Sequence, residues 1–204
     1  MKQIIQRLNS KLGVELMEMP APINEPGHVL IRTTRTLVSK GTESKLVEFG
    51  NASYLGKAKQ KPDRLKVLIK RFKDNGLINT ISTVRDSFEQ YIALGYCNCG
   101  IVMESSVNEF KVGDRVISNG PHAEIVRAPA NLVAKIPDDV TDDEAVFTVV
   151  GSIGLQGIRL CNPTFGENIV VYGLGLVGLI TAQLLKANGV NVIGIDLDEN
   201  KIKE

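Results

Sequence analysis

The segment between residues 168 and 196 constrains the fold of this chain more than any other part of its sequence. It consists of the apolar run Asn168-Ile-Val-Val-Tyr172, the string Gly173-Leu-Gly175-Leu-Val-Gly178, a long apolar stretch, and Val192-Ile-Gly-Ile-Asp196. The continuous apolar run predicts a strand buried on both faces of a parallel sheet. A strand, G-x-G-x-x-G, a helix and a second strand with an acidic end follow one another in dinucleotide-binding βαβ units, so we predict such a unit here.

Each glycine of the string has a separate physical role in that unit. Gly173 permits the tight turn after the strand, and Gly175 has no Cβ, so the backbone can approach a pyrophosphate. Gly178 lets the helix and the strand pack closely. The anion would lie at the helix N-terminus, on the backbone of Leu176 and Val177. The alternative is an ordinary βαβ turn without a ligand, which the surrounding strand and helix pattern makes the weaker interpretation.

The acidic residue Asp196 predicts which nicotinamide cofactor binds. It follows the glycines by about twenty residues, where a carboxylate can accept the hydroxyl groups of a ribose. The same charge should repel a 2′-phosphate, and the following segment 197–201 adds acidic residues and no arginine. We therefore expect NAD as the cofactor in preference to NADP.

The bulk composition is that of a globular protein. Hydrophobic residues make up 43% and charged residues 23% of the chain, and the net charge is +1. A charge so close to zero gives no reason to expect nucleic-acid binding, and no apolar run approaches the roughly 18 residues of a membrane span. The three cysteines, an odd number, do not indicate a disulfide framework. We expect a cytoplasmic protein from the cysteine count, and a small-molecule substrate from the dinucleotide-binding unit.

The part of the chain before the βαβ unit is expected to form a mostly β domain. Residues 13–133 contain short stretches rich in β-branched residues, notably Gly27–Val38, Cys99–Met103, Arg115–Ser118 and Ala123–Val126. Turn signals separate these stretches. We therefore predict an antiparallel, barrel-like arrangement.

Residues 40–90 interrupt this pattern. Apolar residues at helical spacing predict a helix over Arg64–Phe72 and a less regular one over Ile78–Phe88. The stretch Lys40–Asp74 holds ten Lys or Arg and four Asp or Glu, a net charge of +6. Such a stretch could bind an anionic ligand or a nucleic acid. It lacks interleaved aromatic residues, however, and we favour the solvated face of an amphipathic helix pair.

A helix start marks the boundary between the two domains that we predict. Thr141 is a good N-cap residue, and Glu144 stands at the capping-box position. A helical run from there to about Leu160 leads into the strand of the βαβ unit. The first domain then covers residues 1–145, with the basic helical insertion at about 40–90, and a dinucleotide-binding domain starts within 146–204.

The predicted second domain contains a single βαβ unit, whereas a doubly wound sheet normally carries two mononucleotide-binding halves. We therefore expect the chain to be a piece of a longer protein. The strand Val192–Asp196 would have an incompletely covered side, which predicts self-association and is compatible with a homo-oligomer.

The order of several short strings resembles the medium-chain dehydrogenase/reductase superfamily, which includes the zinc alcohol dehydrogenases. Gly113-Asp-Arg-Val116, Ile136-Pro137-Asp138 and Gly166-Glu167 precede the glycine string in that order. The resemblance covers most of the chain. It implies an α/β fold in which a GroES-like barrel, the catalytic domain, is followed by a Rossmann domain with a doubly wound parallel sheet, here incomplete.

Within that superfamily, four stretches are similar to a bacterial subgroup of bi-domain oxidoreductases. They are Ser39-Lys-Gly41-Thr42-Glu43, the insertion Lys57–Phe88, Leu94-Gly-Tyr96 and Leu155-Gln156-Gly157. Members carry a second dehydrogenase unit, similar to glucose-fructose oxidoreductase, and often belong to surface-polysaccharide or sugar metabolism. The resemblance therefore implies a sugar derivative as substrate.

The resemblance also implies a site without zinc. In zinc-dependent members, a cysteine stands where this chain has Lys40 and a histidine where it has Tyr96, and the third ligand position corresponds to Val150. An ammonium, a phenol and an isopropyl group do not make a zinc site, which takes thiolate, imidazole or carboxylate ligands. The four-cysteine structural lobe is missing as well, so we predict no metal.

A zinc-free site needs hydrogen-bond donors or a cation to stabilise a developing alkoxide or enolate. Lys40 and Tyr96 stand at the first two ligand positions, and either side chain could donate a proton to the substrate. Thr42 matches the residue that begins the proton relay in zinc-dependent relatives. The alternatives are that Lys40 only pairs with Glu43 or a cofactor phosphate, and that Tyr96 only fills the vacated space.

The other chemically active side chains are predicted to be structural. His28 and His122 lie in strand-and-turn contexts, and Cys97 and Cys99 are expected to pack within a strand. The chain is therefore expected to belong to an NAD-dependent, zinc-independent oxidoreductase that transfers hydride between the nicotinamide and an alcohol or carbonyl. Two alternatives stay open: an enoyl or quinone reductase, and a non-catalytic cofactor-binding module or inactive fragment.

Overall fold

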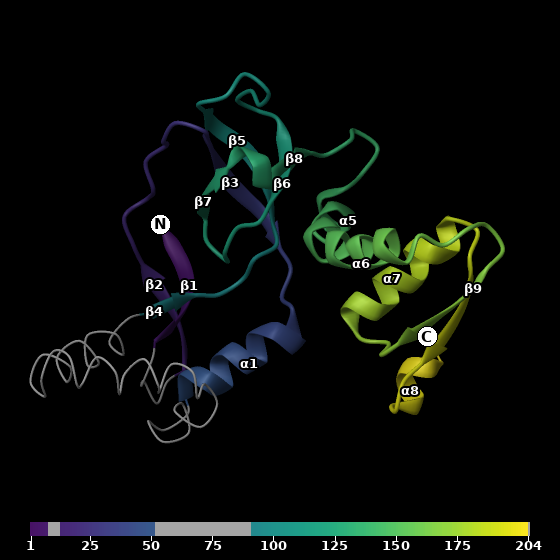
Figure 1. Cartoon of the computed structure of the whole chain (residues 1–204). Helices are drawn as coiled ribbons and strands as arrows, with labels where there is room; N and C mark the ends of the chain where they lie inside the picture. Colours follow the sequence, from purple (N-terminus) through teal and green to yellow (C-terminus); the bar gives the residue numbers. More distant parts are fainter. Residues whose placement is uncertain (8–12, 52–90, 204) are drawn as a thin grey trace, which may run out of the picture.

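The structure, a computed structural model, describes residues 1–7, 13–51 and 91–203 (Figure 1). The helices predicted over Arg64–Phe72 and Ile78–Phe88 lie outside these residues. Strands dominate the first part of the described chain, and helices alternate with strands from α5 (Asp142–Ala145) onward, which confirms a mixed α/β fold with a mostly β first part. None of the helices in the described ranges is long and apolar enough to cross a membrane.

A five-stranded antiparallel sheet forms the centre of the first part. Its strands are arranged in the order β7 (Ile125–Pro129), β3 (His28–Thr36), β5 (Asn98–Ser105), β6 (Arg115–Ser118) and β8 (Val133–Lys135). The short 3-10 helix η1 (Ala130–Leu132) separates β7 from β8. The predicted strands correspond to β3, β5 and β6, whereas the strand predicted at Ala123 begins two residues later, in β7.

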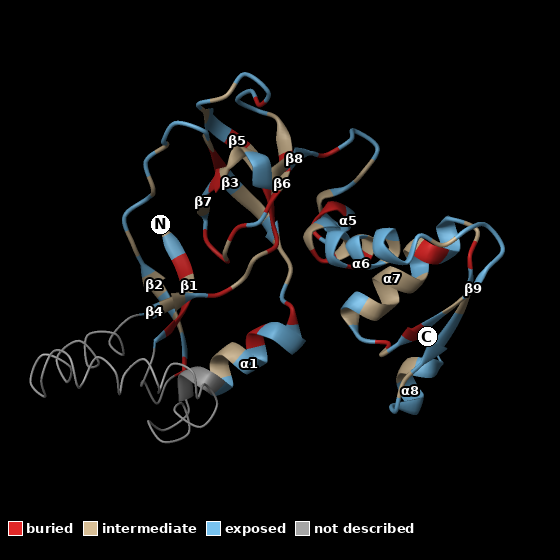
Figure 2. Cartoon of the chain, in the orientation of Figure 1, coloured by how far each residue is buried: buried red, intermediate tan, exposed pale blue. Residues whose placement is uncertain are grey.

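The inward side chains of this sheet form the main hydrophobic core. Val29, Ile31, Val102 and Val116 are buried, and Phe110, between β5 and β6, completes the cluster. In Figure 2 the buried residues lie along β3 and the neighbouring strands. Because β-branched side chains pack well on a pleated surface, these residues favour strands here.

A second, three-stranded sheet lies beside the first, and its antiparallel strands are arranged in the order β2 (Val14–Glu18), β1 (Lys2–Arg7) and β4 (Tyr91–Ala93). The bridge between Gln3 and Ala123 connects it to the segment that leads into β7. An isolated bridge is not a ladder, so within the described residues the sheets stay separate. The predicted barrel is therefore an open pair of sheets and not a closed barrel.

Helix α1 (Lys40–Asn51) follows β3 and lies in the helical insertion predicted at about 40–90, although neither of the two individual helices predicted there covers these residues. The backbone of Ser39 explains where it starts. The Ser39 N–H donates to Glu43 Oε1 at 2.8 Å, and the Ser39 carbonyl accepts from the N–H groups of Glu43 and Thr42 at 2.9 and 3.1 Å. These bonds satisfy backbone groups that a helix N-terminus would otherwise leave unpaired.

Helix α5 confirms the predicted capping box. Thr141 Oγ1 accepts from the Glu144 N–H at 3.3 Å, and Glu144 Oε2 accepts from the Thr141 N–H at 2.9 Å. The single helical run predicted from there to about Leu160 is instead two helices, because α6 (Thr148–Cys161) begins afresh after Phe147.

The predicted βαβ unit is present. Strands β9 (Asn168–Tyr172) and β10 (Asn191–Ile195) pair in parallel, with α7 (Leu176–Ala187) between them in the chain and α8 (Glu199–Ile202) after them. One face of this sheet packs against α7 through a cluster that includes Val171, Leu174 and Leu185. Helix α6 packs in turn on α7, where a Cβ on Gly154 would lie only 2.3 Å from Thr181 Oγ1.

The burial predicted for β9 is wrong on one face. Val171 is buried, but Val170 is 55% and Tyr172 77% exposed, and Ile193, the β10 partner of Val170, is 51% exposed. Side chains alternate across a strand, so these three residues share a face. That face is exposed because, within the described residues, only the opposite one is covered by helices.

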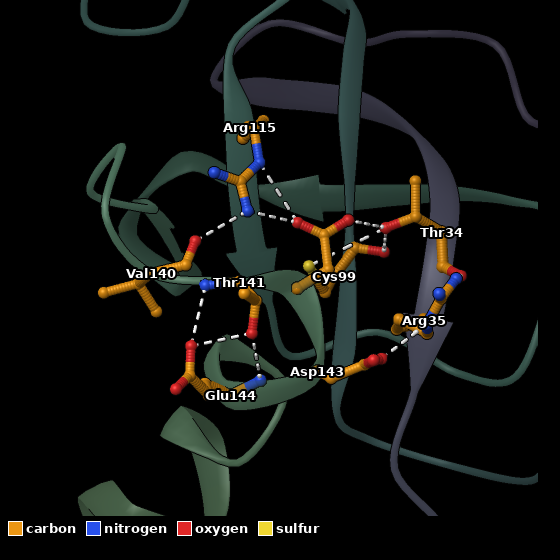
Figure 3. A network of polar contacts seen from close by, with 9 residues as sticks. Thr34, Arg35, Cys99, Arg115, Val140, Thr141, Asp143 and Glu144 are labelled. Atoms are coloured by element: carbon orange, nitrogen blue, oxygen red, sulfur yellow. Dashed lines mark hydrogen bonds and ion pairs between the residues drawn. The ribbon is translucent and has the colours of Figure 1, made fainter.

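A network of polar contacts connects α5 to the five-stranded sheet (Figure 3). Asp142 Oδ2 accepts from Thr34 Oγ1 at 2.5 Å, and Asp142 Oδ1 accepts from Arg115 Nη2 at 2.6 Å. Arg115 also donates to the Val140 carbonyl at 2.8 Å. Donation by Thr34, and then by Arg115, to the charged carboxylate holds the pKa of Asp142 below its ordinary value.

This network should make the stability of the protein sensitive to acid. Because the pKa of Asp142 is lower in the folded state, its contribution is present above the unfolded value and is lost as the pH falls below roughly 4. We expect Asp142→Asn to lower the free energy of unfolding by about 2 kcal/mol at pH 7 and by less at pH 3. Thermal melts of both proteins between these pH values measure the effect.

The neighbouring pair between Asp143 and Arg35 offers a matched control. Its atoms are 2.6 Å apart, but both side chains are more than half exposed, so Asp143→Asn should change stability little. Melting temperatures of Asp142→Asn that run parallel to those of the wild type at every pH would contradict the assigned role.

Candidate cofactor and catalytic site

The loop between β9 and α7 has a backbone shape that suits a bound phosphate. Gly173 has a φ of +96°, a conformation that favours glycine, and its N–H donates to the Ile195 carbonyl at 2.7 Å. Gly175 is the N-cap residue of α7, and no heavy atom lies within 4 Å of the position that a Cβ would occupy there. The space above Gly175 is therefore open to a ligand.

The N-terminus of α7 directs backbone donors from the same place. The Leu179 N–H donates to the Gly175 carbonyl at 2.9 Å. In an α-helix the preceding amides, here those of Leu176, Val177 and Gly178, have no acceptor within the helix and carry the positive end of its dipole. A pyrophosphate fits this combination of open space and backbone donors.

Gly178 lies where the helix and the loop touch. A Cβ on this residue would lie 1.8 Å from the Gly173 carbonyl oxygen and 2.9 Å from its carbon. Since no side chain tolerates such distances, glycine is required for α7 to pack on the loop. The first and third glycines thus shape the loop, and the second leaves room for the ligand.

Asp196 directly follows β10, and its carboxylate contacts the glycine loop. Its Oδ2 accepts from the Leu174 N–H at 2.7 Å and its Oδ1 from the Asp198 N–H at 2.9 Å, while Lys201 Nζ lies 3.5 Å from Oδ1. Donation by the Asp198 amide, and then by the Leu174 amide, lowers the pKa of Asp196. The group is therefore ionised at neutral pH, and a carboxylate has further lone pairs with which to accept ribose hydroxyls.

Lys40 and Thr42 lie in the first turn of α1, and both side chains are exposed. The Thr42 hydroxyl is 3.5 Å from that of Ser39. Glu43, the partner considered for Lys40, instead accepts from the Ser39 amide through Oε1 and lies 3.0 Å from His122 through Oε2. Both oxygens of Glu43 therefore already have partners other than Lys40.

Tyr96 lies in the segment between β4 and β5 and is half-buried. Its neighbour Cys97 is fully buried, and the Val150 N–H at the start of α6 donates to the Cys97 sulfur. Tyr96 and Val150 are two of the three positions compared with zinc ligands. Cys97 brings them close together, because it follows Tyr96 in the chain and bonds to the Val150 backbone. Desolvation, and then the charge of Glu43, raises the pKa of Cys97 to about 11, so the thiol is neutral.

His122 was predicted to be structural, but its place between the two candidate turns was not predicted. It is 5% exposed, and its Nε2 faces Glu43 Oε2, 79 positions away in the chain, at 3.0 Å. No spacing rule connects two residues so far apart. Two features of the sequence could have drawn attention to the pair. Glu43 is an acid within the string Lys40–Glu43, and His122 is one of only two histidines in the chain.

The structure connects the two candidate regions through packed helices. His122 contacts both the turn that carries Lys40 and the turn that carries Tyr96. Cys97, next to Tyr96, bonds to the Val150 backbone at the start of α6. Helix α6 packs on α7, and α7 starts at the glycine loop.

A metal centre is not indicated. Within the described part of the chain, no group of three or more His, Cys, Asp or Glu could hold a metal ion. Cys97 and Cys99 are buried and Cys161 is exposed, and none forms a disulfide. The two buried cysteines pack in the core as predicted, whereas the absence of zinc stays a prediction.

Comparison with known proteins associates this geometry with dehydrogenases. Residues 167–204 match the UDP-glucose/GDP-mannose dehydrogenase family, NAD binding domain. An alcohol dehydrogenase of Geobacillus stearothermophilus is 30% identical over 114 residues, which are 55% of this chain and 34% of that enzyme. The D-guloside 3-dehydrogenase of Escherichia coli is 36% identical over 109 residues, which are 50% of this chain and 31% of that enzyme.

Solved structures share the whole described arrangement. Galactitol-1-phosphate dehydrogenase from Escherichia coli has a TM-score of 0.72 at 17% identity and covers 100% of this chain, which matches 57% of that one. A mycobacterial protein complexed with NADPH has a TM-score of 0.68 at 24% identity, and the match covers 99% of this chain and 54% of that one.

The fold and the glycine loop define an arrangement in which a β-rich part precedes a βαβ unit of the dinucleotide-binding kind. Within that class, the similarity to alcohol and sugar dehydrogenases agrees with the resemblance to the medium-chain dehydrogenase/reductase superfamily. The matched stretches are 34% and 31% of the lengths of the two curated relatives, so the chain spans about a third of them.

Proposed function

We propose that this chain is part of an NAD-dependent, zinc-independent oxidoreductase that transfers hydride between the nicotinamide and an alcohol or carbonyl substrate. The observation that carries the proposal is the cradle between β9 and α7, which is open above Gly175 and bounded by Asp196. When bound, the dinucleotide supplies or accepts the hydride. The names of the relatives, alcohol dehydrogenase and D-guloside 3-dehydrogenase, support an alcohol substrate, and the second supports a sugar derivative.

Three residues of the β-rich part are proposed to handle the proton and the developing charge. The Tyr96 hydroxyl holds a proton at the substrate oxygen, and the exposed Lys40 ammonium stabilises negative charge there. The buried Ser39 hydroxyl donates to Thr42 Oγ1 at 3.5 Å, and the exposed Thr42 hydroxyl passes the proton on to solvent. The support is that, among the ion pairs of the described residues, the buried Glu43 pairs with His122 and not with Lys40.

The preference for NAD over NADP is proposed on the charge of Asp196. Two backbone amides keep this carboxylate ionised beside the glycine loop, where a 2′-phosphate would meet like charge. Lys201, 3.5 Å from Asp196, offsets part of that repulsion. The net preference therefore depends on how much of the carboxylate charge the ammonium leaves uncompensated.

Titration of cofactors by fluorescence tests this site directly. We expect Asp196→Ala to raise the Kd for NADH by about tenfold, since roughly 1.4 kcal/mol of hydrogen bonding is lost, and to leave or improve the Kd for NADPH. Glu199→Ala, which removes an exposed acid three positions along, is the control and should change neither value. Tighter binding of NADPH than of NADH by the unaltered chain would sink the assignment.

The reaction itself is tested by oxidation of NADH in the presence of a panel of ketones, sugar ketones, enones and quinones. Turnover on the ketone arm supports the proposed reaction, and turnover only on enones or quinones assigns the chain to a reductase of activated double bonds. Cofactor binding without turnover on any arm assigns a non-catalytic module.

Three further assignments remain proposals. We propose a division near residue 145, where α5 ends, with residues 146–204 as the nucleotide-binding part. We propose that the chain is part of a bacterial bi-domain oxidoreductase, because the strings Ser39–Glu43 and Leu94–Tyr96 resemble those of that subgroup. A cytoplasmic location suits three cysteines that are all free.

A further inference from the structure

We infer that His122 is a positioning residue: its side chain holds the turn Lys40–Glu43 and the turn Gly95–Cys97 in one arrangement. The inference rests on the proposed function, because these turns carry the residues Lys40, Thr42 and Tyr96 that we assign to proton transfer. Its structural part can be tested without a substrate.

The first contact of His122 is with the helix that carries Lys40. His122 Nε2 lies 3.0 Å from Glu43 Oε2, and both side chains are buried, at 5% and 9% exposed. A carboxylate only accepts hydrogen bonds, so the ring nitrogen donates. The other oxygen of Glu43 accepts from the Ser39 N–H that starts α1. His122 thereby holds the residue that fixes the first turn of the helix.

The second contact is with the turn that carries Tyr96. Gly95 has a φ of +87°, and a Cβ there would lie 2.7 Å from the Cγ, Cδ2 and Nδ1 atoms of the His122 ring. The ring therefore rests directly on the Gly95 backbone. In addition, the His122 N–H donates to the Leu94 carbonyl at 2.7 Å. Tyr96 thus follows two residues that His122 contacts.

The backbone around His122 is itself well fixed. The His122 carbonyl accepts from the Ile4 N–H of β1 at 2.8 Å. On the other side of the two turns, the Leu37 N–H donates to the Cys97 carbonyl at 3.1 Å. Of the residues that form these turns, Lys40 and Thr42 are exposed, so their own side chains do not fix their position. The buried ring of His122 does.

The unused nitrogen of the ring argues against mere space filling. His122 Nδ1 is buried and, within the described residues, has no hydrogen-bond partner. An unsatisfied buried acceptor is unfavourable, and an apolar side chain of similar size would avoid that cost. The role of a histidine at this place is therefore the hydrogen bond that its other nitrogen, Nε2, makes to Glu43.

Two variants separate the bond from the volume of the ring. His122→Phe keeps a ring on Gly95 but removes the donor, whereas His122→Gln restores an amide N–H at a similar distance from the backbone. His28→Phe is the matched control, because the contact of His28 Nδ1 with the Pro26 carbonyl lies in an exposed turn.

The first readout is the reactivity of thiols toward a disulfide reagent in the folded chain. In the wild type Cys161 is the only exposed cysteine, and Cys97 is fully buried. Cys97 lies close to Glu43, and the pKa of its thiol is raised by burial and then by the charge of Glu43. We expect one fast-reacting thiol in the wild type, in His28→Phe and in His122→Gln, and two in His122→Phe. Hydrogen exchange at the Thr42 and Glu43 amides should accelerate in His122→Phe alone.

The second readout uses whichever substrate the panel identifies. Displacement of a catalytic group by about 1 Å can cost 100-fold in rate, so a loosened turn should lower kcat by about tenfold in His122→Phe. His122→Gln should recover most of that loss, and the Kd for NADH should change less than twofold in both. If His122→Phe does not fold, Glu43→Ala cuts the same bond from the other side and should expose the same thiol.

The inference is overturned if His122→Phe keeps a single reactive thiol and wild-type amide exchange, or if His122→Gln behaves like His122→Phe. A wild type without turnover on any substrate overturns the proposed function instead, and the thiol and exchange results still decide the structural role.

Discussion

Replacement of Gly178 by alanine should both destabilise the βαβ unit and abolish NADH binding. The new Cβ would lie 1.8 Å from the Gly173 carbonyl oxygen, so either α7 or the loop must move. That movement disturbs the core around Leu174 and Leu185 and the cradle at the same time. Overpacking of this kind costs about 3 kcal/mol or more, which corresponds to roughly 6–12 °C in melting temperature for a chain of this size. Thermal melts and NADH titration measure the two effects.

Two other glycines provide controls for this variant. Gly157, in α6, has no heavy atom within 4 Å of its Cβ position, so Gly157→Ala should raise stability by up to about 1 kcal/mol. Gly175→Ala adds a methyl group to open space in the cradle, and should weaken NADH binding while the melting temperature stays the same. A Gly178→Ala chain with wild-type stability and NADH affinity would falsify this account of the loop.

Replacement of Tyr96 by phenylalanine should lower kcat by about 100-fold, the lower end of what a general acid contributes. The ring stays in place, so the half-buried turn and its contact with His122 are kept. The Kd for NADH should be unchanged, because the hydroxyl acts on the substrate oxygen and not on the cofactor phosphates. Steady-state kinetics on the active arm of the substrate panel and NADH titration measure these quantities.

Tyr91→Phe is the matched control, since it removes the same hydroxyl from an exposed position on β4. Its kcat should equal that of the wild type. Equal turnover of Tyr96→Phe and Tyr91→Phe would remove Tyr96 from the mechanism and leave it as a residue that fills space.

Features that depend on neighbouring residues were predictable. The capping box of Thr141 and Glu144, the glycine loop and the strands β3, β5 and β6 all follow from spacing over a few positions. Helix α1 lies in the insertion predicted to be helical, but its bounds were not predicted, because its sequence is mostly polar and its start depends on Glu43 bonding back to Ser39. Burial of β9 was overestimated, because an apolar run does not say how many layers cover it.

The candidate site was predictable only in part. The strings that contain Lys40, Tyr96 and the glycines can be read along the chain, but the contacts that bring them together cannot. Glu43 and His122 are 79 positions apart, and a hydrogen bond over that separation depends on how α1 packs against the sheets. The resemblance placed Tyr96 and Val150 as former ligand positions, and the structure shows that Cys97 connects them.

The break between α5 and α6 has a mechanical consequence. Asp142 attaches α5 to the five-stranded sheet through Thr34 and Arg115, whereas the close approach of Gly154 to Thr181 attaches α6 to α7. The short interval at 146–147 therefore joins a helix held on the sheet to a helix held on α7, and Val146 is itself buried in the cluster that contains Cys99. Val150, one turn further on, is fully buried and its amide bonds to Cys97, so the start of α6 fixes the position of α7 and its glycine loop relative to the β-rich part.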